Sequence, residues 1–67
     1  MIKIKVNGEE WQVEPETNIA NLLSRKNLSP HICAVEVNRQ IIAKEQYVAL
    51  VLQAGDEVEI IRFMAGG

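Results

Sequence analysis

The alternation of apolar and charged residues at the start of the chain constrains its fold more than any other feature. Residues 2–6 read Ile-Lys-Ile-Lys-Val, the two-residue period of a strand that buries one face. Asn7-Gly8 follows at once, and this dipeptide favours a tight hairpin turn because both residues tolerate positive φ angles. Residues 9–13 then alternate again, with Trp11 and Val13 as apolar positions. The sequence therefore predicts that the chain opens with a β-hairpin.

Helical spacing of apolar residues follows the hairpin, between residues 19 and 28. Thr17 or Asn18 is suited to cap this helix, because the side-chain oxygen of either residue accepts a hydrogen bond from a free amide of the first turn. We expect the helix to end before Ser29-Pro30, since the residue ahead of a proline is pushed away from helical backbone angles.

The second half of the chain reads mainly as strands. Residues 33–37 and 57–60 alternate between apolar and polar side chains, and Ile41-Ile42 forms a short apolar pair after a turn. The segment 44–52 is ambiguous, because a short helical turn and an extended stretch fit its apolar residues equally well.

These elements predict an α+β fold. The amphipathic helix has to bury its stripe against one face of a sheet, and a chain of 67 residues has material for one compact core. The simplest packing is a β-grasp (ubiquitin-like) domain over residues 1–67. In it one main helix lies on a mixed sheet of four to five strands, with the first and last strands adjacent at the centre. Residues 63–67 are predicted to form a flexible functional tail.

Composition excludes several classes of function. The net charge is −2 and the basic residues are scattered, so we expect no nucleic-acid partner. One Cys and one His provide neither an internal disulfide nor a structural zinc site. No apolar run approaches the ~20 residues that span a bilayer, and the alternating start is unlike a signal peptide. We therefore expect a cytoplasmic protein with no membrane partner, no metal and no bound cofactor. We also expect that the protein is not an enzyme in its own right.

Gly66-Gly67 ends the sequence, and two interpretations are open. Such an end is ordinarily a frayed terminus. Alternatively, two residues without Cβ atoms let the backbone enter a narrow passage, and residues 63–67 reach at most about 16–18 Å. The terminal carboxylate then serves as a reactive group in another protein's active site. It requires activation by ATP, and a partner has to supply the ATP site because the chain has no P-loop.

The order of several motifs resembles the ThiS family, the ubiquitin-like sulfur carriers of thiamine biosynthesis, over essentially the whole chain. The resemblance lies in an opening Ile-x-Ile-x-Val-Asn-Gly-Glu hairpin, a helix with Thr17 and Leu22-Leu23, the stretch Ala34 to Ile42, the turn and strand Gly55 to Ile60, and Gly66-Gly67. No single motif carries it.

The resemblance implies a protein co-substrate whose C-terminus is chemically modified. In this family the carboxylate corresponding to Gly67 is adenylated by a ThiF-like adenylyltransferase, which consumes ATP, and is converted to a thiocarboxylate with sulfur from a donor protein. The sulfur then passes to a ThiG-like thiazole synthase. Gly66 carries over with Gly67 as the functional motif. Phe63, Met64 and Ala65 carry over as positions that line the partner's channel.

Two apolar residues near the end of the last strand have two possible environments. If Val58 and Ile60 face the helix, Ile61 and Phe63 fall on the opposite face of the sheet, where they form a docking surface for a partner. The alternative is a local bulge that turns Phe63 back into the core.

Other chemically versatile side chains are predicted to be structural or solvated. Cys33 shares a strand face with two valines and is expected in the core, although a sulfur-accepting thiol is the alternative. His31 is expected as a solvated loop residue rather than a general base. Glu57 and Glu59 lie two residues apart on a strand and are expected on a solvent-facing surface rather than as a catalytic pair.

Three competing functions remain beside the sulfur carrier of thiamine biosynthesis. The first is a carrier like the small subunit of molybdopterin synthase, which ends in the same Gly-Gly. The second is a β-grasp interaction module that binds a partner and does no chemistry at its terminus. A nucleic-acid-binding β-grasp domain is the third, and the acidic charge balance counts against it.

Overall fold

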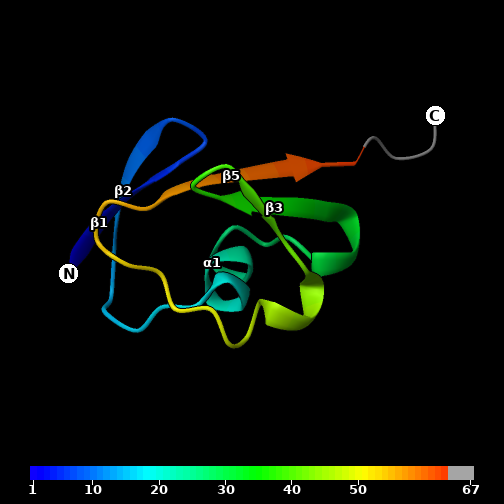
Figure 1. The fold of residues 1–67 in the computed structure, drawn as a ribbon, viewed down its shortest axis with the longest axis horizontal. Coiled ribbons are helices and arrows are strands. Elements are labelled where there is room, and N and C mark those ends of the chain that lie inside the picture. The colour runs from blue at the N-terminus through cyan, green and yellow to red at the C-terminus, as the bar shows by residue number, and fades with distance from the viewer. Residues whose placement is uncertain (64–67) are drawn as a thin grey trace.

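A computed structural model describes residues 1–63 of the chain, and the elements below belong to this range. Within this range, the chain begins with a β-hairpin and ends with a β-strand (Figure 1). They are β1 (Ile2–Val6), β2 (Glu9–Val13), α1 (Ile19–Arg25), a 3-10 helix (Pro30–Ile32), β3 (Cys33–Val37), β4 (Gln40–Ile42), a second 3-10 helix (Lys44–Gln46) and β5 (Glu57–Arg62).

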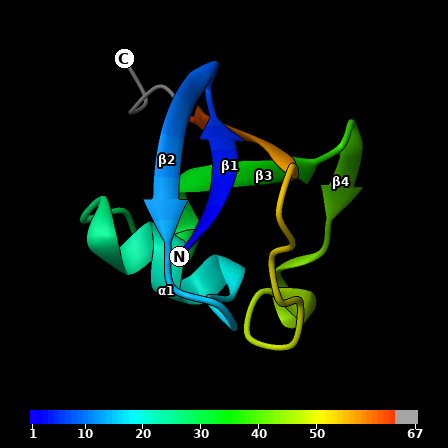
Figure 2. The same ribbon diagram turned by 90° about the vertical axis from the view of Figure 1, so that its left-hand side faces the viewer.

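The strands form one mixed sheet in the order β2-β1-β5-β3-β4. β1 and β5 are parallel neighbours at its centre, and the pairs β1–β2, β3–β4 and β3–β5 are antiparallel. The helix α1 lies against one face of the sheet, and the other face carries no helix in the described part of the chain (Figures 1 and 2). The predicted β-grasp fold is confirmed, including the adjacent first and last strands.

Both hairpins turn through residues with positive φ. Asn7 (φ 50°) and Gly8 (φ 84°) connect β1 to β2, as the Asn-Gly dipeptide predicted. Asn38 (φ 52°) and Arg39 (φ 70°) connect β3 to β4 in the same backbone region. A two-residue turn of this hand matches the twist of the flanking strands and sets the register of each pair.

Asn18 caps α1, which decides between the two predicted residues. Its side chain accepts a hydrogen bond from the Asn21 N–H (2.7 Å), and the Asn21 side chain accepts one from the Asn18 N–H (3.3 Å), forming a capping box. The hydroxyl of Thr17 instead donates to the Glu14 carbonyl. After α1, Asn27 adopts φ 58°, so the helix ends ahead of Pro30 as predicted.

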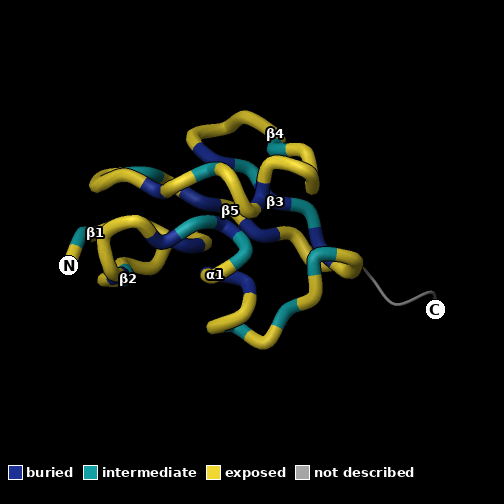
Figure 3. The backbone as a smooth tube through the Cα atoms, turned by 90° about the horizontal axis from the view of Figure 1, so that it is seen from below, coloured by how far each residue is buried: buried dark blue, intermediate teal, exposed yellow. Residues whose placement is uncertain are grey.

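The core lies between α1 and the inner face of the sheet (Figure 3). The helix contributes its predicted apolar stripe, and the strands contribute alternate residues; the buried hydrophobic set is Ile4, Val6, Val13, Ile19, Leu22, Leu23, Cys33, Val35, Val37, Tyr47, Leu52, Val58 and Ile60. The ambiguous segment 44–52 forms a 3-10 helix, after which Tyr47 and Leu52 enter the core and Val51 bridges to Asn18. Within residues 1–63, no helix is long and apolar enough to cross a membrane.

Candidate functional site

β5 is the element that positions the C-terminal segment of the chain. It lies between β1 and β3, and Val58 and Ile60 on its inner face are buried against the core. The Phe63 N–H donates to the Ile32 carbonyl (2.8 Å), so the backbone is still attached to the sheet one residue beyond β5. Four residues predicted to form the functional tail, Met64, Ala65, Gly66 and Gly67, lie outside the described residues.

Two asparagine side chains from the hairpin turns hold β5 in place. The side-chain amide of Asn7 makes two hydrogen bonds with the backbone of Ile60: it accepts one from the Ile60 N–H (2.7 Å) and donates one to the Ile60 carbonyl (3.2 Å). At the other end of the strand, Asn38 accepts from the Glu57 N–H (3.0 Å) and donates to the Asp56 carboxylate (3.0 Å). Both hairpins are therefore tied through side chains to the strand that leads to the terminus.

Ile61 and Phe63 lie on the open face of the sheet, the face without a helix in residues 1–63. Their side chains are 48% and 54% exposed. The exposure of Phe63 shows that the predicted alternative, a bulge that turns this ring into the core, is wrong. The prediction that both residues face outwards is confirmed, because Val58 and Ile60 point the other way.

Two further residues join Ile61 and Phe63 through the β3–β5 register. Ala34 pairs with Ile61, and the backbone bond from Phe63 extends this ladder to Ile32, which is 39% exposed. We call Ile32, Ala34, Ile61 and Phe63 the apolar patch. Ile32 and Ala34 were not predicted because they lie 31 and 27 residues from Phe63 and Ile61, and no local sequence pattern indicates a pairing over that distance. The patch borders the point where the chain leaves β5.

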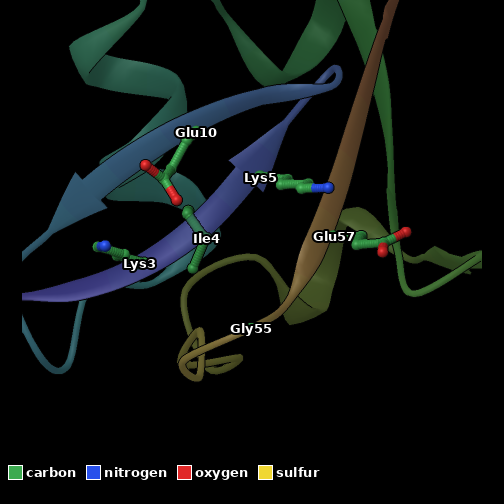
Figure 4. Close-up of a pocket in the computed structure, with 6 residues that line it drawn as sticks. All are labelled: Lys3, Ile4, Lys5, Glu10, Gly55 and Glu57. Carbon is green, nitrogen blue, oxygen red and sulfur yellow. The ribbon is translucent and has the colours of Figure 1, made fainter.

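The opposite end of the open face is charged. Lys5 of β1 lies between two cross-strand neighbours of opposite sign, Glu10 of β2 and Glu57 of β5. Figure 4 shows the Lys5 side chain between these two glutamates, in a shallow depression lined by Lys3, Ile4, Lys5, Glu10, Gly55 and Glu57. Glu57 and Glu59 are both exposed, as predicted for solvated side chains. Alternating charges of this kind complement each other across the strands.

Cys33 and His31 are placed as the sequence predicted. Cys33 is fully buried and its thiol lies 3.4 Å from the Ser29 carbonyl. Burial raises the pKa of this thiol above its usual 9.0, against the opposing charges of Lys44 and Arg62, so Cys33 is a poor nucleophile. His31 is exposed on the 3-10 helix that precedes β3. Among residues 1–63, no three His, Cys, Asp or Glu side chains gather as a metal site.

The buried thiol and Tyr47 predict a loss of stability at alkaline pH. Burial raises the pKa of Cys33 above 9.0 and that of Tyr47 above 10.0, so the unfolded chain releases these protons before the folded one does. Above about pH 9 the unfolded state therefore binds fewer protons, and the free energy of unfolding falls as pH rises. We expect the midpoint of urea unfolding, measured by circular dichroism, to decrease steadily from pH 8 to 11. The Cys33→Ala variant should show a shallower decrease; equal slopes for both proteins would contradict the assignment.

The sequence model of the ThiS family matches residues 3–67. The chain belongs to the ThiS family. It is 35% identical to the sulfur carrier protein ThiS of Bacillus subtilis, and the match covers 96% of this chain and 98% of the relative. A crystal structure of a thiamine biosynthesis protein (ThiS) from Geobacter metallireducens has a TM-score of 0.81 and 32% identity, and covers 98% of this ThiS-family chain and 100% of its own.

Two relatives of this ThiS-family chain are much longer proteins. They are called thiazole synthase and come from Magnetococcus marinus (36% identical) and Paramagnetospirillum magneticum (32% identical). Each match covers 98% of this chain, which spans only 20% of the relative. A ubiquitin-like protein from the archaeon Caldiarchaeum subterraneum, with a TM-score of 0.52 and 19% identity over 97% of both chains, shows the shared β-grasp fold alone.

Proposed function

We propose that this ThiS-family chain is a sulfur carrier of thiamine biosynthesis, and that the carboxylate of Gly67 is the group that carries the sulfur. The observation that carries the proposal is the family match, which runs from residue 3 through Gly66-Gly67. The match to the sulfur carrier of B. subtilis over 98% of that protein supports the same role. The exposed apolar patch beside the end of β5 supplies a surface on which an enzyme docks while it acts on the terminus.

The chemistry follows from the low reactivity of a carboxylate. An oxygen of the Gly67 carboxylate attacks the α-phosphorus of ATP bound by a ThiF-like adenylyltransferase, and pyrophosphate leaves. The terminal sulfur of a persulfide on a donor protein attacks the carbonyl carbon of the acyl-adenylate, and AMP leaves. A thiol then attacks the donor's sulfur in the resulting acyl disulfide, so that the S–S bond breaks, the thiocarboxylate leaves with the electron pair, and the donor and the thiol are joined in a new disulfide. The carrier is thus a co-substrate and contributes no catalytic residue of its own. A cytoplasmic location is part of the proposal, because these steps need a compartment that contains ATP.

A thiazole synthase is the proposed acceptor of the sulfur. Support comes from the two long relatives called thiazole synthase, in which a fifth of the protein is similar to this chain. Union of two functions in one polypeptide keeps their reactive groups at high effective concentration, which a transfer between them requires. A carrier that is a separate protein lacks this covalent link and has to bind its partner through a docking surface. This is the role proposed for the apolar patch.

Replacing Phe63 by Asp is expected to weaken docking on the adenylyltransferase without unfolding the carrier. A charge at the centre of a desolvated contact is costly, and we expect about a tenfold higher concentration of carrier for half-maximal ATP–pyrophosphate exchange. Because Phe63 is half exposed, the melting temperature should change by only a few degrees. Val48→Asp is the matched control, since Val48 is 72% exposed in the segment between the second 3-10 helix and β5.

The unaltered chain and the two variants test different proposals. Exchange supported by the unaltered chain tests the sulfur-carrier function, because pyrophosphate exchange requires formation of the acyl-adenylate. Equal half-maximal concentrations for Phe63→Asp and Val48→Asp would show that the apolar patch takes no part in docking on this enzyme.

A further inference from the structure

Two glutamates of like charge face each other on the open face, directly beside the apolar patch. Glu36 of β3 pairs with Glu59 of β5, and both project to the same side as Ala34 and Ile61, the next pair along these strands. On its other side, Glu36 pairs with Ile41 of β4, which is 77% exposed. The cross-strand neighbours of Glu36 are therefore a second carboxylate and an exposed hydrophobic side chain. Like charges directly opposite each other destabilise a sheet.

Two other glutamates on the same face have a cation as their cross-strand neighbour. Glu57 is two residues from Glu59 on β5, and its neighbour across the parallel pair is Lys5. Glu10 of β2 is also a cross-strand neighbour of Lys5, so the register places one cation between these two carboxylates. In the part of the chain that the structure describes, Glu59 has no cation as a cross-strand neighbour, because the parallel pairing with β1 ends at Val6 and the Asn7 turn follows. Glu36 is moreover half-buried, which increases the cost of an uncompensated charge.

We propose that the Glu36–Glu59 pair receives a basic side chain of thiazole synthase when that protein docks on the apolar patch. The inference rests on the sulfur-carrier function, since it specifies the partner's contact on the same surface. The carboxylates and the patch form one continuous area, with Ile41 and Ile61 on either side of the pair. A partner that covers the area removes it from water, where a guanidinium between two carboxylates forms two charge-assisted hydrogen bonds. The partner thus has an apolar surface with an arginine or lysine in it.

A second copy of this chain fits the surface poorly. A two-fold contact through the open face brings two Glu36–Glu59 pairs towards each other and adds two more like charges to each. Charge complementarity therefore favours a different protein with the opposite charge. The pair contributes specificity as well, because a partner without a cation at this point leaves both carboxylates desolvated and unpaired.

The test compares Glu59→Gln with Glu57→Gln, a control on the same strand and the same face. Binding of each carrier to the thiazole synthase of the same organism is measured by titration calorimetry. We expect the Kd of Glu59→Gln to rise about tenfold, the effect of losing one charge-assisted hydrogen bond, and the Kd of Glu57→Gln to change less than twofold. The difference should shrink in 1 M NaCl, where the screening length is about 3 Å.

Stability of the free carrier distinguishes a binding role from a structural one. Removal of a like charge should leave the melting temperature of Glu59→Gln unchanged or raise it, so that weaker binding accompanies equal or greater stability. An unchanged or lower Kd for Glu59→Gln overturns the proposal. The proposal is also overturned if the unaltered carrier forms a dimer in solution and Glu59→Gln dissociates it. If the unaltered carrier supports pyrophosphate exchange in either case, the proposed function stands and only the contact is refuted; if it supports none, both fail.

Discussion

A chain that lacks Gly67 is expected to lose sulfur transfer completely while it folds as the full chain does. The deletion moves the terminal carboxylate back by one residue, up to about 3.6 Å, away from the α-phosphorus that it has to attack. Thiazole formation in a mixture of carrier, adenylyltransferase, sulfur donor and thiazole synthase should fall to the level without carrier. Residues 1–63 hold the buried core, so the melting temperature should stay the same.

Two matched variants show whether the position of the carboxylate is what matters. Gly67→Ala keeps the reach and adds one methyl group, so its activity should be reduced, because the passage in the partner excludes side chains, but not abolished as in the deletion. A tag appended after Gly67 removes the free carboxylate at this position and should abolish transfer, whereas a non-catalytic interaction module would tolerate it. Normal thiazole formation with either the deletion or the tag would contradict the account.

Replacing Asn7 by Ala is expected to lower the free energy of unfolding by about 3–4 kcal/mol. The side chain makes two hydrogen bonds with Ile60, each contributing about 1 kcal/mol, and alanine adds strain of about 1–2 kcal/mol at φ 50°. In a domain of this size the loss corresponds to a fall in melting temperature of at least about 12 °C. Urea denaturation followed by circular dichroism measures it.

Asn7→Gly separates the two causes. Glycine adopts the same positive φ without strain but makes no side-chain hydrogen bond, so we expect it to lose about half as much stability as Asn7→Ala. If the two variants are equally destabilised, the strain contribution is absent. If neither is destabilised, the hydrogen bonds from Asn7 to Ile60 have no energetic role.

Local chemistry accounts for the parts of the fold that were predictable. The Asn7-Gly8 turn, the helix with its cap and the apolar alternation of β1, β3 and β5 depend on residues close in sequence, and the structure confirms each of them. The central pairing of β1 with β5 also followed, because an amphipathic helix needs one continuous sheet face to cover. The segment 44–52 stayed ambiguous because its residues enter the core singly, at Tyr47 and Leu52, and show no period.

Pairings between distant residues account for what was missed. The bonds from Asn7 to Ile60, 53 residues away, and the Glu36–Glu59 pair depend on the register of the assembled sheet. Trp11 is a third example, because its large side chain had no explanation in the sequence. The structure places Arg25 and Lys26 over its ring, 5.3 and 4.8 Å from the centroid, so the last turn of α1 packs on β2 through cation–π contacts.

Fragment mass spectrometry of the C-terminal residues tests the central claim most directly. The carrier is incubated with ATP, a sulfur donor and the adenylyltransferase, and fragmentation has to isolate Gly67, because exchange of oxygen for sulfur adds nearly the same mass as oxidation of Met1, Met64 or Cys33. The account predicts one sulfur in place of one oxygen in the fragment that contains Gly67, and none when ATP is omitted. An unmodified Gly67 after incubation with all components would contradict it.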